Sequence, residues 1–253
     1  MAVIPASRRA DKAITAQDWG GMDTGMTMGW FEPVMAYCER TGPGFWAEPL
    51  NAASNAAFLL AAAAAARRAR AADPPDRACL GLAGLIALVG IGSFLFHTLA
   101  VTWAMYADII PITVFIVAYL VLALHRFLKL PRLRVEAATA GFILFSFTLV
   151  PTLDGLTGSD ISARTNGSID YLPAALALFT VAALDRPETR FVGTGRRLVV
   201  VGVLFLISLT VRTIDQLACA VLPTGTHALW HLLNALVLYA LVATAIRHRA
   251  VAG

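Results

Sequence analysis

Apolar residues fall into seven long stretches, separated by short polar segments. A helix that crosses a membrane needs about 20 mostly apolar residues, with about 17 to 25 as the usual range. The stretches cover residues 49–66, 78–99, 103–124, 135–153, 169–184, 198–222 and 227–246. This pattern predicts an all-α, polytopic membrane protein built as a bundle of seven transmembrane helices. We expect a polar N-terminal segment over 1–36, one membrane domain over 37–248 and a short tail over 249–253.

The basic residues gather in every second connecting segment, which predicts the orientation of the chain. Lys and Arg in short loops stay on the cytoplasmic side of a membrane. Such loops and the tail hold 14 of the 20 basic residues: Arg67, Arg68, Arg70, Arg77, Arg126, Lys129, Arg132, Arg134, Arg186, Arg190, Arg196, Arg197, Arg247 and Arg249. The C-terminus is therefore expected inside and the N-terminus outside. Arg8, Arg9 and Lys12 depart from this bias, but they lie far from the first stretch, where they carry little weight.

Composition agrees with a membrane protein. Hydrophobic residues make up 58% of the 253 residues and charged residues only 14%, whereas a soluble domain has about 25% charged residues. The net charge of +4 is spread between apolar stretches, so no basic face for nucleic acid is expected. The first 29 residues lack the apolar core of a signal peptide, so insertion is expected to use the internal stretches. Nothing in the sequence indicates the oligomeric state.

Three cysteines are present, and no two of them form a CxxC pair. Cys38 precedes the first stretch and Cys219 lies near the outer end of the sixth, so the predicted topology puts both on the oxidising side. Cys79 begins the second stretch on the cytoplasmic side. Disulfides persist only in oxidising compartments, so we expect a Cys38–Cys219 disulfide and a reduced Cys79.

The five histidines divide into two groups. His125 and His248 sit beside arginines at cytoplasmic ends of the stretches, where we expect them to be solvated. His97, His227 and His231 lie at outer ends, within or next to apolar sequence. Ionisable groups in such places are costly and usually face the interior of the bundle. His227 and His231 are four residues apart, which puts both rings on one helix face, one turn apart.

The predicted topology also brings Ser93 and Asp108 to these histidines. Ser93 precedes His97 by four residues, and Asp108 lies near the start of the third stretch. All five side chains are then expected at one depth and on one side. Three imidazoles leave a fourth position for water, as in the open tetrahedral zinc sites of hydrolases. The alternative is three separate histidines, each hydrogen-bonded within the bundle.

A second polar group surrounds the start of the first stretch: Glu48, Asn51, Ser54 and Asn55. Amides buried in a span need partners. Two interpretations stay open, a polar seam that packs helices and a ligand-binding role near the histidines. Asp215 is expected to pair with the nearby Arg212 and to take no part in catalysis.

Taken in order, several of these motifs resemble the alkaline ceramidase family. They are YCE at 37–39, EPLN at 48–51 with Ser54 and Asn55, Ser93-x3-His97 with Asp108, Ile214-Asp215 with Cys219, and His227-x3-His231. This family is part of a superfamily of seven-span, three-histidine membrane hydrolases, often called CREST, which includes the adiponectin and progestin receptors. The resemblance runs from about residue 37 to 232, nearly the whole membrane body.

The resemblance implies a role for each of the five residues. His97, His227 and His231 would bind zinc. Asp108 would hold or deprotonate the metal-bound water, and Ser93 would support the oxyanion. These roles suit amide hydrolysis, because zinc provides both a strong nucleophile and a polarised carbonyl.

The resemblance also implies a calcium site in the N-terminal segment. Glu39 and Glu48 match two of its acidic ligands. Ala36 and Thr41 stand where the family pattern has Asp and Asn. Two side-chain ligands are therefore missing, and calcium affinity depends on the number and charge of its ligands.

The function implied is a zinc amidase that cleaves the N-acyl bond of ceramide or a related N-acyl lipid, giving a fatty acid and a sphingoid-type amine. Its substrate would come from the membrane, and its site would face away from the cytoplasm. A membrane lipid esterase of the same superfamily is one alternative. A receptor-like zinc protein without turnover is another, although the receptors are expected in the opposite orientation. A transporter is disfavoured, because no paired broken-helix segments are present.

Overall fold

The computed structural model describes residues 29–185 and 193–252, and these are overwhelmingly helical. Within these two ranges, β pairing is limited to an isolated bridge between Pro33 and Val101. Arg8, Arg9, Lys12, Arg186 and Arg190 lie outside the described residues. The short elements are η2 (Gly29–Phe31), α1 (Pro49–Ser54), α6 (Ile161–Arg164), η3 (Ser168–Tyr171) and α9 (Asp215–Ala218). The longer ones are α2 (Ala56–Arg70), α3 (Arg77–Leu99), α4 (Thr102–Arg126), α5 (Arg132–Thr157), α7 (Leu172–Leu184), α8 (Thr194–Thr213) and α10 (His227–Ala252).

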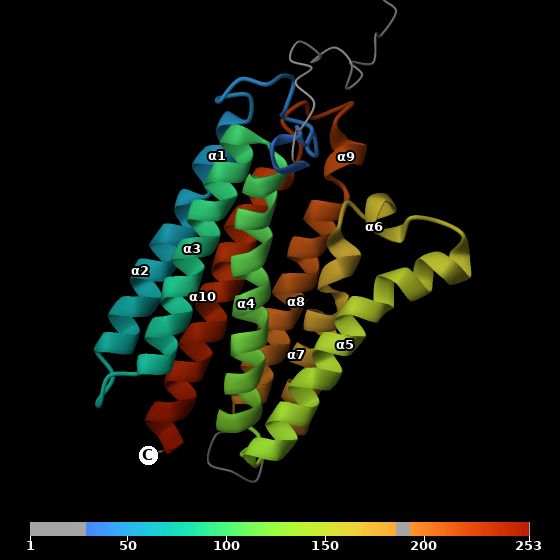
Figure 1. Ribbon diagram of the computed structural model, residues 1–253. Coiled ribbons are helices and arrows are strands. Elements are labelled where there is room, and N and C mark those ends of the chain that lie inside the picture. Colours follow the sequence, from blue (N-terminus) through green and yellow to red (C-terminus); the bar gives the residue numbers. More distant parts are fainter. Residues whose placement is uncertain (1–28, 186–192, 253) are drawn as a thin grey trace, which may run out of the picture.

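Among the described residues, six helical segments are long and apolar enough to cross a membrane. They are Pro49–Arg70, Arg77–Leu99, Thr102–Arg126, Arg132–Thr157, Thr194–Thr213 and His227–Ala250. The predicted fifth stretch forms a shorter apolar helical segment, Ser168–Leu184. It packs against α8 and α4, within the same bundle (Figure 1). The helical membrane architecture is thus confirmed, with six helices that meet the length of a full span.

The helices do not contribute equally to the core. α10 packs against α2, α3 and α8, and it is the most enclosed of the six long segments. α5 is the least enclosed, and it leans away from the other helices toward its C-terminal end (Figure 1). Large apolar residues such as Leu133 and Phe147 are exposed on α5. Such a surface suits lipid contact.

The first stretch is confirmed as one long segment, Pro49–Arg70, with a turn at Asn55 between α1 and α2, where the Asn55 side chain donates to the carbonyl of Asn51 at 2.9 Å. One other predicted boundary is wrong, for a local reason. The sixth stretch ends at Thr213 rather than 222, and Asp215 begins the separate helix α9. The Asp215 carboxylate accepts from the backbone N–H groups of Cys38, Thr226 and His227. These contacts fix the chain in a tight bend, and the expected pairing of Asp215 with Arg212 is wrong.

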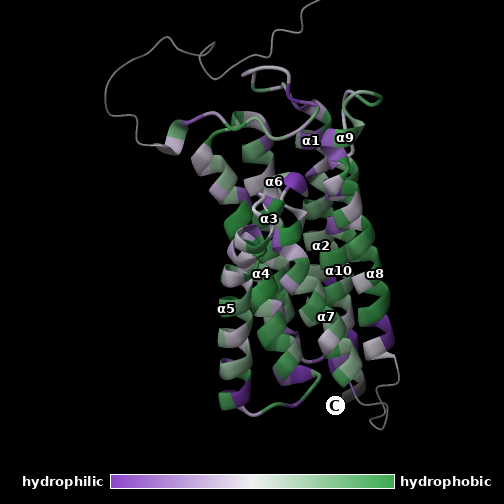
Figure 2. Ribbon diagram, turned by 90° about the vertical axis from the view of Figure 1, so that its right-hand side faces the viewer, coloured by the Kyte–Doolittle hydropathy of each residue, from purple (hydrophilic) through white to green (hydrophobic). Residues whose placement is uncertain are grey.

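The two ends of the bundle differ in their polar residues, while the middle is apolar (Figure 2). We call one end the arginine end, after Arg126 and Arg249, which pair with Asp76 there. We call the other the histidine end, after His97, His227 and His231. The prediction for His248, at the arginine end, is wrong, because this residue is buried rather than solvated. Its ring contacts Thr194 Oγ1 at 3.1 Å and packs on Phe127, which keeps water away.

A close approach of α3 and α4 adjoins the histidine end. A β-carbon added at Gly92 would lie 1.9 Å from the carbonyl oxygen of Ala107 and 2.6 Å from its carbonyl carbon. No side chain larger than hydrogen fits there without moving a helix. Gly92 therefore sets the distance between the two helices beside Ser93 and Asp108.

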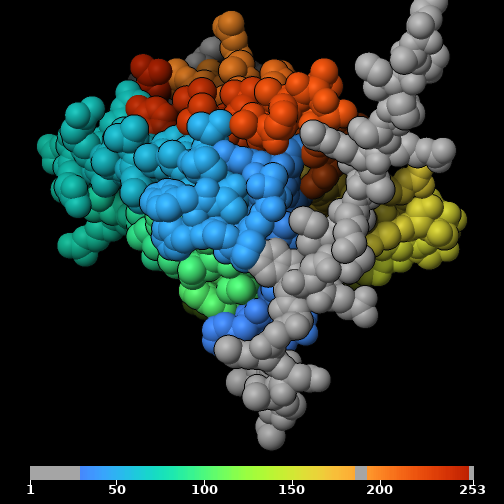
Figure 3. All heavy atoms as spheres, turned by 90° about the horizontal axis from the view of Figure 1, so that it is seen from above, coloured from blue at the N-terminus to red at the C-terminus, as the bar shows by residue number. Residues whose placement is uncertain are grey.

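The disulfide between Cys38 and Cys219 is present, as predicted, and Cys79 is a free, buried thiol. The disulfide ties the segment before α1 to the residues after α9. In Figure 3 this segment appears as blue atoms across the centre of the histidine end, beside the orange-red residues near α9. Residues 29–48 thus cover the end of the bundle where the candidate residues gather.

Candidate metal centre

Three buried histidines meet near the histidine end of the bundle. His97 comes from the last turns of α3, and His227 and His231 come from the first turns of α10. All three are 0% exposed. One ring nitrogen from each lies within 4.8 Å of the others, so the group is able to hold a metal ion. The spacing of four residues does place His227 and His231 on the same helix face.

Two of the histidines are oriented by a polar neighbour. His97 Nδ1 lies 2.6 Å from Glu48 Oε2, and His231 Nδ1 lies 2.7 Å from Ser54 Oγ. Metal-binding histidines almost always have their second nitrogen held in this way. The start of the first span is therefore more than a packing seam: Ser54 contacts the site, whereas Asn55 bonds within its own helix.

The remaining imidazole nitrogens fit metal coordination. Among the described residues, His97 Nε2 and both nitrogens of His227 have no hydrogen-bond partner. His231 Nε2 has only a long contact, 3.4 Å, to Ser93 Oγ. Buried polar atoms are rarely left unpaired in proteins, and clusters of them need an explanation. A metal ion would explain the unpaired nitrogens of His97 and His227 and the long contact of His231 Nε2.

Aromatic rings hold His227. The Tyr37 ring stacks on it with a centroid distance of 3.6 Å, and Trp230 lies 5.0 Å away at a similar tilt. Burial raises the pKa of the Tyr37 hydroxyl, which keeps this group neutral. Packing, rather than a hydrogen bond, thus fixes the His227 ring.

Ser93 and Asp108 lie beside the histidines. Both are buried, and Ser93, His97 and Arg212 are near enough to interact with the Asp108 carboxyl group. Asp108 Oδ1 has no hydrogen-bond partner within the described chain. The structure thus brings together all five residues that the sequence singled out. Their chemical roles remain predictions.

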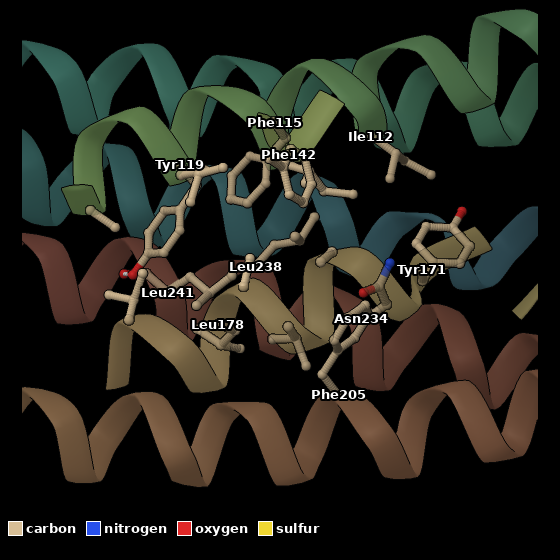
Figure 4. A pocket seen from close by; sticks show the side chains of 17 residues that line it. Ile112, Phe115, Tyr119, Phe142, Tyr171, Leu178, Phe205, Asn234, Leu238 and Leu241 are labelled. Atoms are coloured by element: carbon tan, nitrogen blue, oxygen red, sulfur yellow. Dashed lines mark hydrogen bonds between the residues drawn. The ribbon is translucent and has the colours of Figure 1, made fainter. Parts of the chain in front are cut away.

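One cavity lies beside this site, and a second, apolar cavity shares Tyr171 with it. The first, of about 230 Å³, lies beside Asp108, with Tyr37, Asn166, Tyr171 and Arg212 on its walls. The other is apolar and runs between α4, α5, α7, α8 and α10. Figure 4 shows Tyr171 and Asn234 near one end of it and Tyr119 and Leu241 near the other. Tyr171 lines both cavities, so the polar and apolar spaces adjoin at this residue.

Arg212 is a residue whose place sequence reasoning missed. Its guanidinium lies 4.9 Å from the Trp230 ring centroid and 5.8 Å from that of Tyr171, and it donates to the Asn166 carbonyl at 3.0 Å. Cation–π contacts of this kind are strongest where water is excluded. A charged residue in an apolar stretch is a functional candidate by default. The position of Arg212 within the apolar stretch 198–222 could have indicated this, but from the sequence Arg212 was explained by a local pair with Asp215.

The proposed calcium ligands are already engaged. Glu39 accepts from the backbone N–H groups of Leu50 and Asn51 at 2.7 and 2.8 Å. Glu48 pairs with Arg40, Asn51 and His97. Burial alone would raise the pKa of Glu48, but the hydrogen bonds of His97, Asn51 and Arg40 outweigh burial and lower it. With the buried Arg40 beside Glu48, this group of residues does not fit a calcium ion.

The family of the chain follows from a comparison with known proteins. The family model described as Ceramidase matches residues 35–252. The chain belongs to the ceramidase family. The match begins just before Tyr37 and includes every helix from α1 to α10. No curated protein matched the chain. Membership in the ceramidase family implies a hydrolase of an amide bond, acting on a lipid, and the long apolar helices agree with a multi-pass membrane protein.

Proposed function

We propose that this member of the ceramidase family is a zinc-dependent amidase that hydrolyses the N-acyl bond of ceramide or a related N-acyl lipid. The products are a fatty acid and a sphingoid-type amine. The observation that carries the proposal is the cluster of three buried histidines next to Ser93 and Asp108, in which His97 and His227 have unpaired ring nitrogens and His231 Nε2 has a long contact to Ser93. A purely structural cluster would be expected to pair these nitrogens.

The three histidines are suited to zinc. Glu48 and Ser54 hold the Nδ1 atoms of His97 and His231, which directs the Nε2 atom of each ring toward the shared space. Tyr37 and Trp230 hold the plane of His227. A zinc ion held by these three imidazoles would lower the pKa of a bound water to about 7 and would polarise a carbonyl oxygen.

Asp108 and Ser93 have two further roles, proton transfer and stabilisation of the developing negative charge. The Asp108 carboxylate accepts a proton from the attacking water and returns it to the nitrogen of the leaving amine. Positioned acid–base groups typically contribute about 10²–10⁴-fold to the rate. The Ser93 hydroxyl donates a hydrogen bond to the carbonyl oxygen, where negative charge develops.

The two adjoining cavities suit a lipid with one polar linkage. The apolar cavity, of about 70 Å³, is lined by hydrophobic side chains of the kind that would contact part of an acyl chain, and the cavity beside Asp108 offers Asn166, Tyr171 and Arg212 to a hydroxylated headgroup. The junction at Tyr171 would place the amide near Asp108. The membrane supplies such a substrate directly, since a lipid is able to enter from the side.

The same proposal includes the topology. We take Ser168–Leu184 as the seventh, short membrane element, because it packs within the bundle. The arginine end is cytoplasmic by the distribution of basic residues. The Cys38–Cys219 disulfide agrees with a histidine end on the oxidising, non-cytoplasmic side. The segments 1–36, 37–248 and 249–253 remain our division of the chain.

The test separates the amidase from an esterase that uses the same metal centre. Purified protein is incubated in mixed micelles with an N-acyl sphingoid lipid and with a matched diacylglycerophospholipid, and products are measured by mass spectrometry. We expect fatty acid and amine from the first lipid and no fatty acid from the second. The His231→Ala protein is the blank. Zinc-dependent fatty acid release from the glycerolipid alone would contradict the amidase and favour the esterase.

A further inference from the structure

Arg40 is a buried arginine that contacts the support of the metal centre. It is 5% exposed. Its Nε donates to Glu48 Oε1, its Nη1 to the Gly42 carbonyl at 3.0 Å and its Nη2 to the His97 carbonyl at 2.8 Å. All three guanidinium nitrogens are therefore in use. Burying an arginine is costly unless its charge and its donors are compensated, and here they are.

Glu48 carries the effect of Arg40 to the metal centre. One carboxylate oxygen of Glu48 pairs with Arg40, and the other lies 2.6 Å from His97 Nδ1 and 3.0 Å from Asn51 Nδ2. Arg40 thus contacts the His97 residue directly at its carbonyl and indirectly through Glu48. The position of the His97 ring depends on where this arginine holds the carboxylate.

The same residues are poor calcium ligands. Calcium takes six to eight oxygen ligands. Both oxygens of Glu39 accept from backbone amides at the start of α1. Ala36 has no side-chain oxygen, and Thr41 offers a hydroxyl rather than an amide or carboxylate oxygen. A guanidinium next to Glu48 would also repel a divalent cation at short range.

We infer that Arg40 is a positioning residue that takes the place of the calcium ion implied by the family resemblance. It supplies the positive charge as part of the chain and holds Glu48 against His97. The metal centre is therefore assembled without calcium. This inference rests on the proposed zinc site, and its tests read metal binding rather than turnover.

The first test uses the wild-type protein in detergent, loaded with zinc and freed of calcium. Its melting temperature is measured as calcium is added, with magnesium as the control. A ligand that binds the folded state raises the melting temperature, so we expect calcium to produce no rise beyond that of magnesium. A calcium-specific rise would overturn the inference.

The second test removes the arginine. Loss of a residue that supports a metal ligand typically weakens metal affinity about 10–100-fold, and we expect this for Arg40→Ala in competition with a chromogenic zinc chelator. Arg40→Lys keeps the positive charge but loses the several N–H donors of the guanidinium, so it should have a zinc affinity between those of Arg40→Ala and wild type. Arg132→Ala is the matched control, because Arg132 is exposed and lies far along the chain from the site, in a surface pair with Glu136. Equal zinc affinity in Arg40→Ala and wild type would refute the role.

The third test asks whether Arg40 acts through Glu48. Zinc affinity is measured for Arg40→Ala, Glu48→Gln and the double variant. Residues in one network give non-additive effects, so the double variant should lose little more than the worse single variant. Additive losses would contradict the inference. If Arg40→Ala does not fold, the calcium titration of the wild type still decides.

The outcomes also separate this inference from the proposed function. A wild-type protein that binds no zinc at the three histidines would remove the proposed function. A wild-type protein that binds zinc and also responds to calcium would remove the role of Arg40 alone.

Discussion

Each end of the bundle has a buried carboxylate paired with an arginine, but the two ends differ in whether their other buried polar atoms have hydrogen-bond partners. At the arginine end, Arg126 donates to both oxygens of Asp76, at 2.7 and 3.1 Å, and the backbone N–H of Cys79 is also bound there. At the histidine end, Glu48 is just as fully engaged, yet His97 and His227 keep unpaired nitrogens within the described structure.

This difference distinguishes structural from reactive polar groups. A buried network is most stabilising when every donor and acceptor is paired. The network of Asp76, Arg126 and Cys79 follows this rule and should matter for stability alone. The histidine end departs from this rule at the atoms that face the candidate site. Unpaired polar atoms lower stability, and functional sites are where proteins commonly contain them.

The strongest way to break the comparison is to remove a histidine. His97→Ala, His227→Ala and His231→Ala should each lose bound zinc and lipid hydrolysis together. Loss of an outer supporting residue costs about 10–100-fold, so loss of a ligand should cost more than about 100-fold. Metal analysis and product release are measured on the same preparation, with His125→Ala, an exposed histidine at the other end, as the control. Full zinc retention in any variant would show that the assigned ligand is wrong.

Asp108→Asn should separate metal binding from turnover. The amide has nearly the same shape as the carboxylate but does not accept the proton of the attacking water. We expect zinc content near that of wild type and a rate lower by about 10²–10⁴-fold. The measurement is the initial rate of fatty acid release at saturating lipid, beside metal analysis. Wild-type activity in this variant would exclude proton transfer by Asp108.

Ser54→Ala should have a smaller effect on the same site. Its hydroxyl holds His231 Nδ1, so its loss leaves the ligand present but less well oriented. We expect zinc affinity to fall by about 10–100-fold. Ser146→Ala is a suitable control, because the Ser146 hydroxyl donates to the carbonyl of Phe142 in its own helix. Unchanged zinc affinity in Ser54→Ala would show that the 2.7 Å contact does not position the ring.

Asp76→Asn should sharpen the comparison from the other end, with lower stability and unchanged zinc content. Losing the charged hydrogen bonds to Arg126 should cost about 1.5–3 kcal/mol of unfolding free energy. Scanning fluorimetry measures the melting temperature, and loss of zinc in this variant would contradict the separation of the two ends.

The same residue gives a pH dependence. Burial would raise the pKa of Asp76, but Arg126 outweighs burial and lowers it below the ordinary value. The stabilisation is therefore present above about pH 4, the unfolded pKa, and is lost as pH falls through the folded pKa. The wild-type melting temperature should fall more steeply with acid than that of Asp76→Asn. Parallel acid curves for the two proteins would argue against this contribution.

Sequence reasoning predicted what depends on chain length and topology. Apolar length predicted the six long segments, and the alternation of basic loops brought His97, Asp108 and His227 to one end. Sequence reasoning failed for residues whose partners lie far away in the sequence. Asp215 binds amides of residues 38, 226 and 227, and His248 contacts Thr194. Such partners follow from tertiary packing, so the nearest charged neighbour in sequence was a poor guide.

Gly92 has a consequence beyond helix packing. Because Gly92 has no β-carbon, the backbone of α3 contacts the backbone of Ala107, just before Asp108. Any larger residue would push α4 outward and take the carboxylate away from Ser93 and the histidines, even though position 92 has no chemical group of its own. In a screen that measures only activity, a substitution at position 92 would look like the loss of a catalytic residue. Metal analysis would show that the three histidines still bind the metal. The position of the Asp108 carboxylate thus depends on a residue whose side chain is a single hydrogen atom.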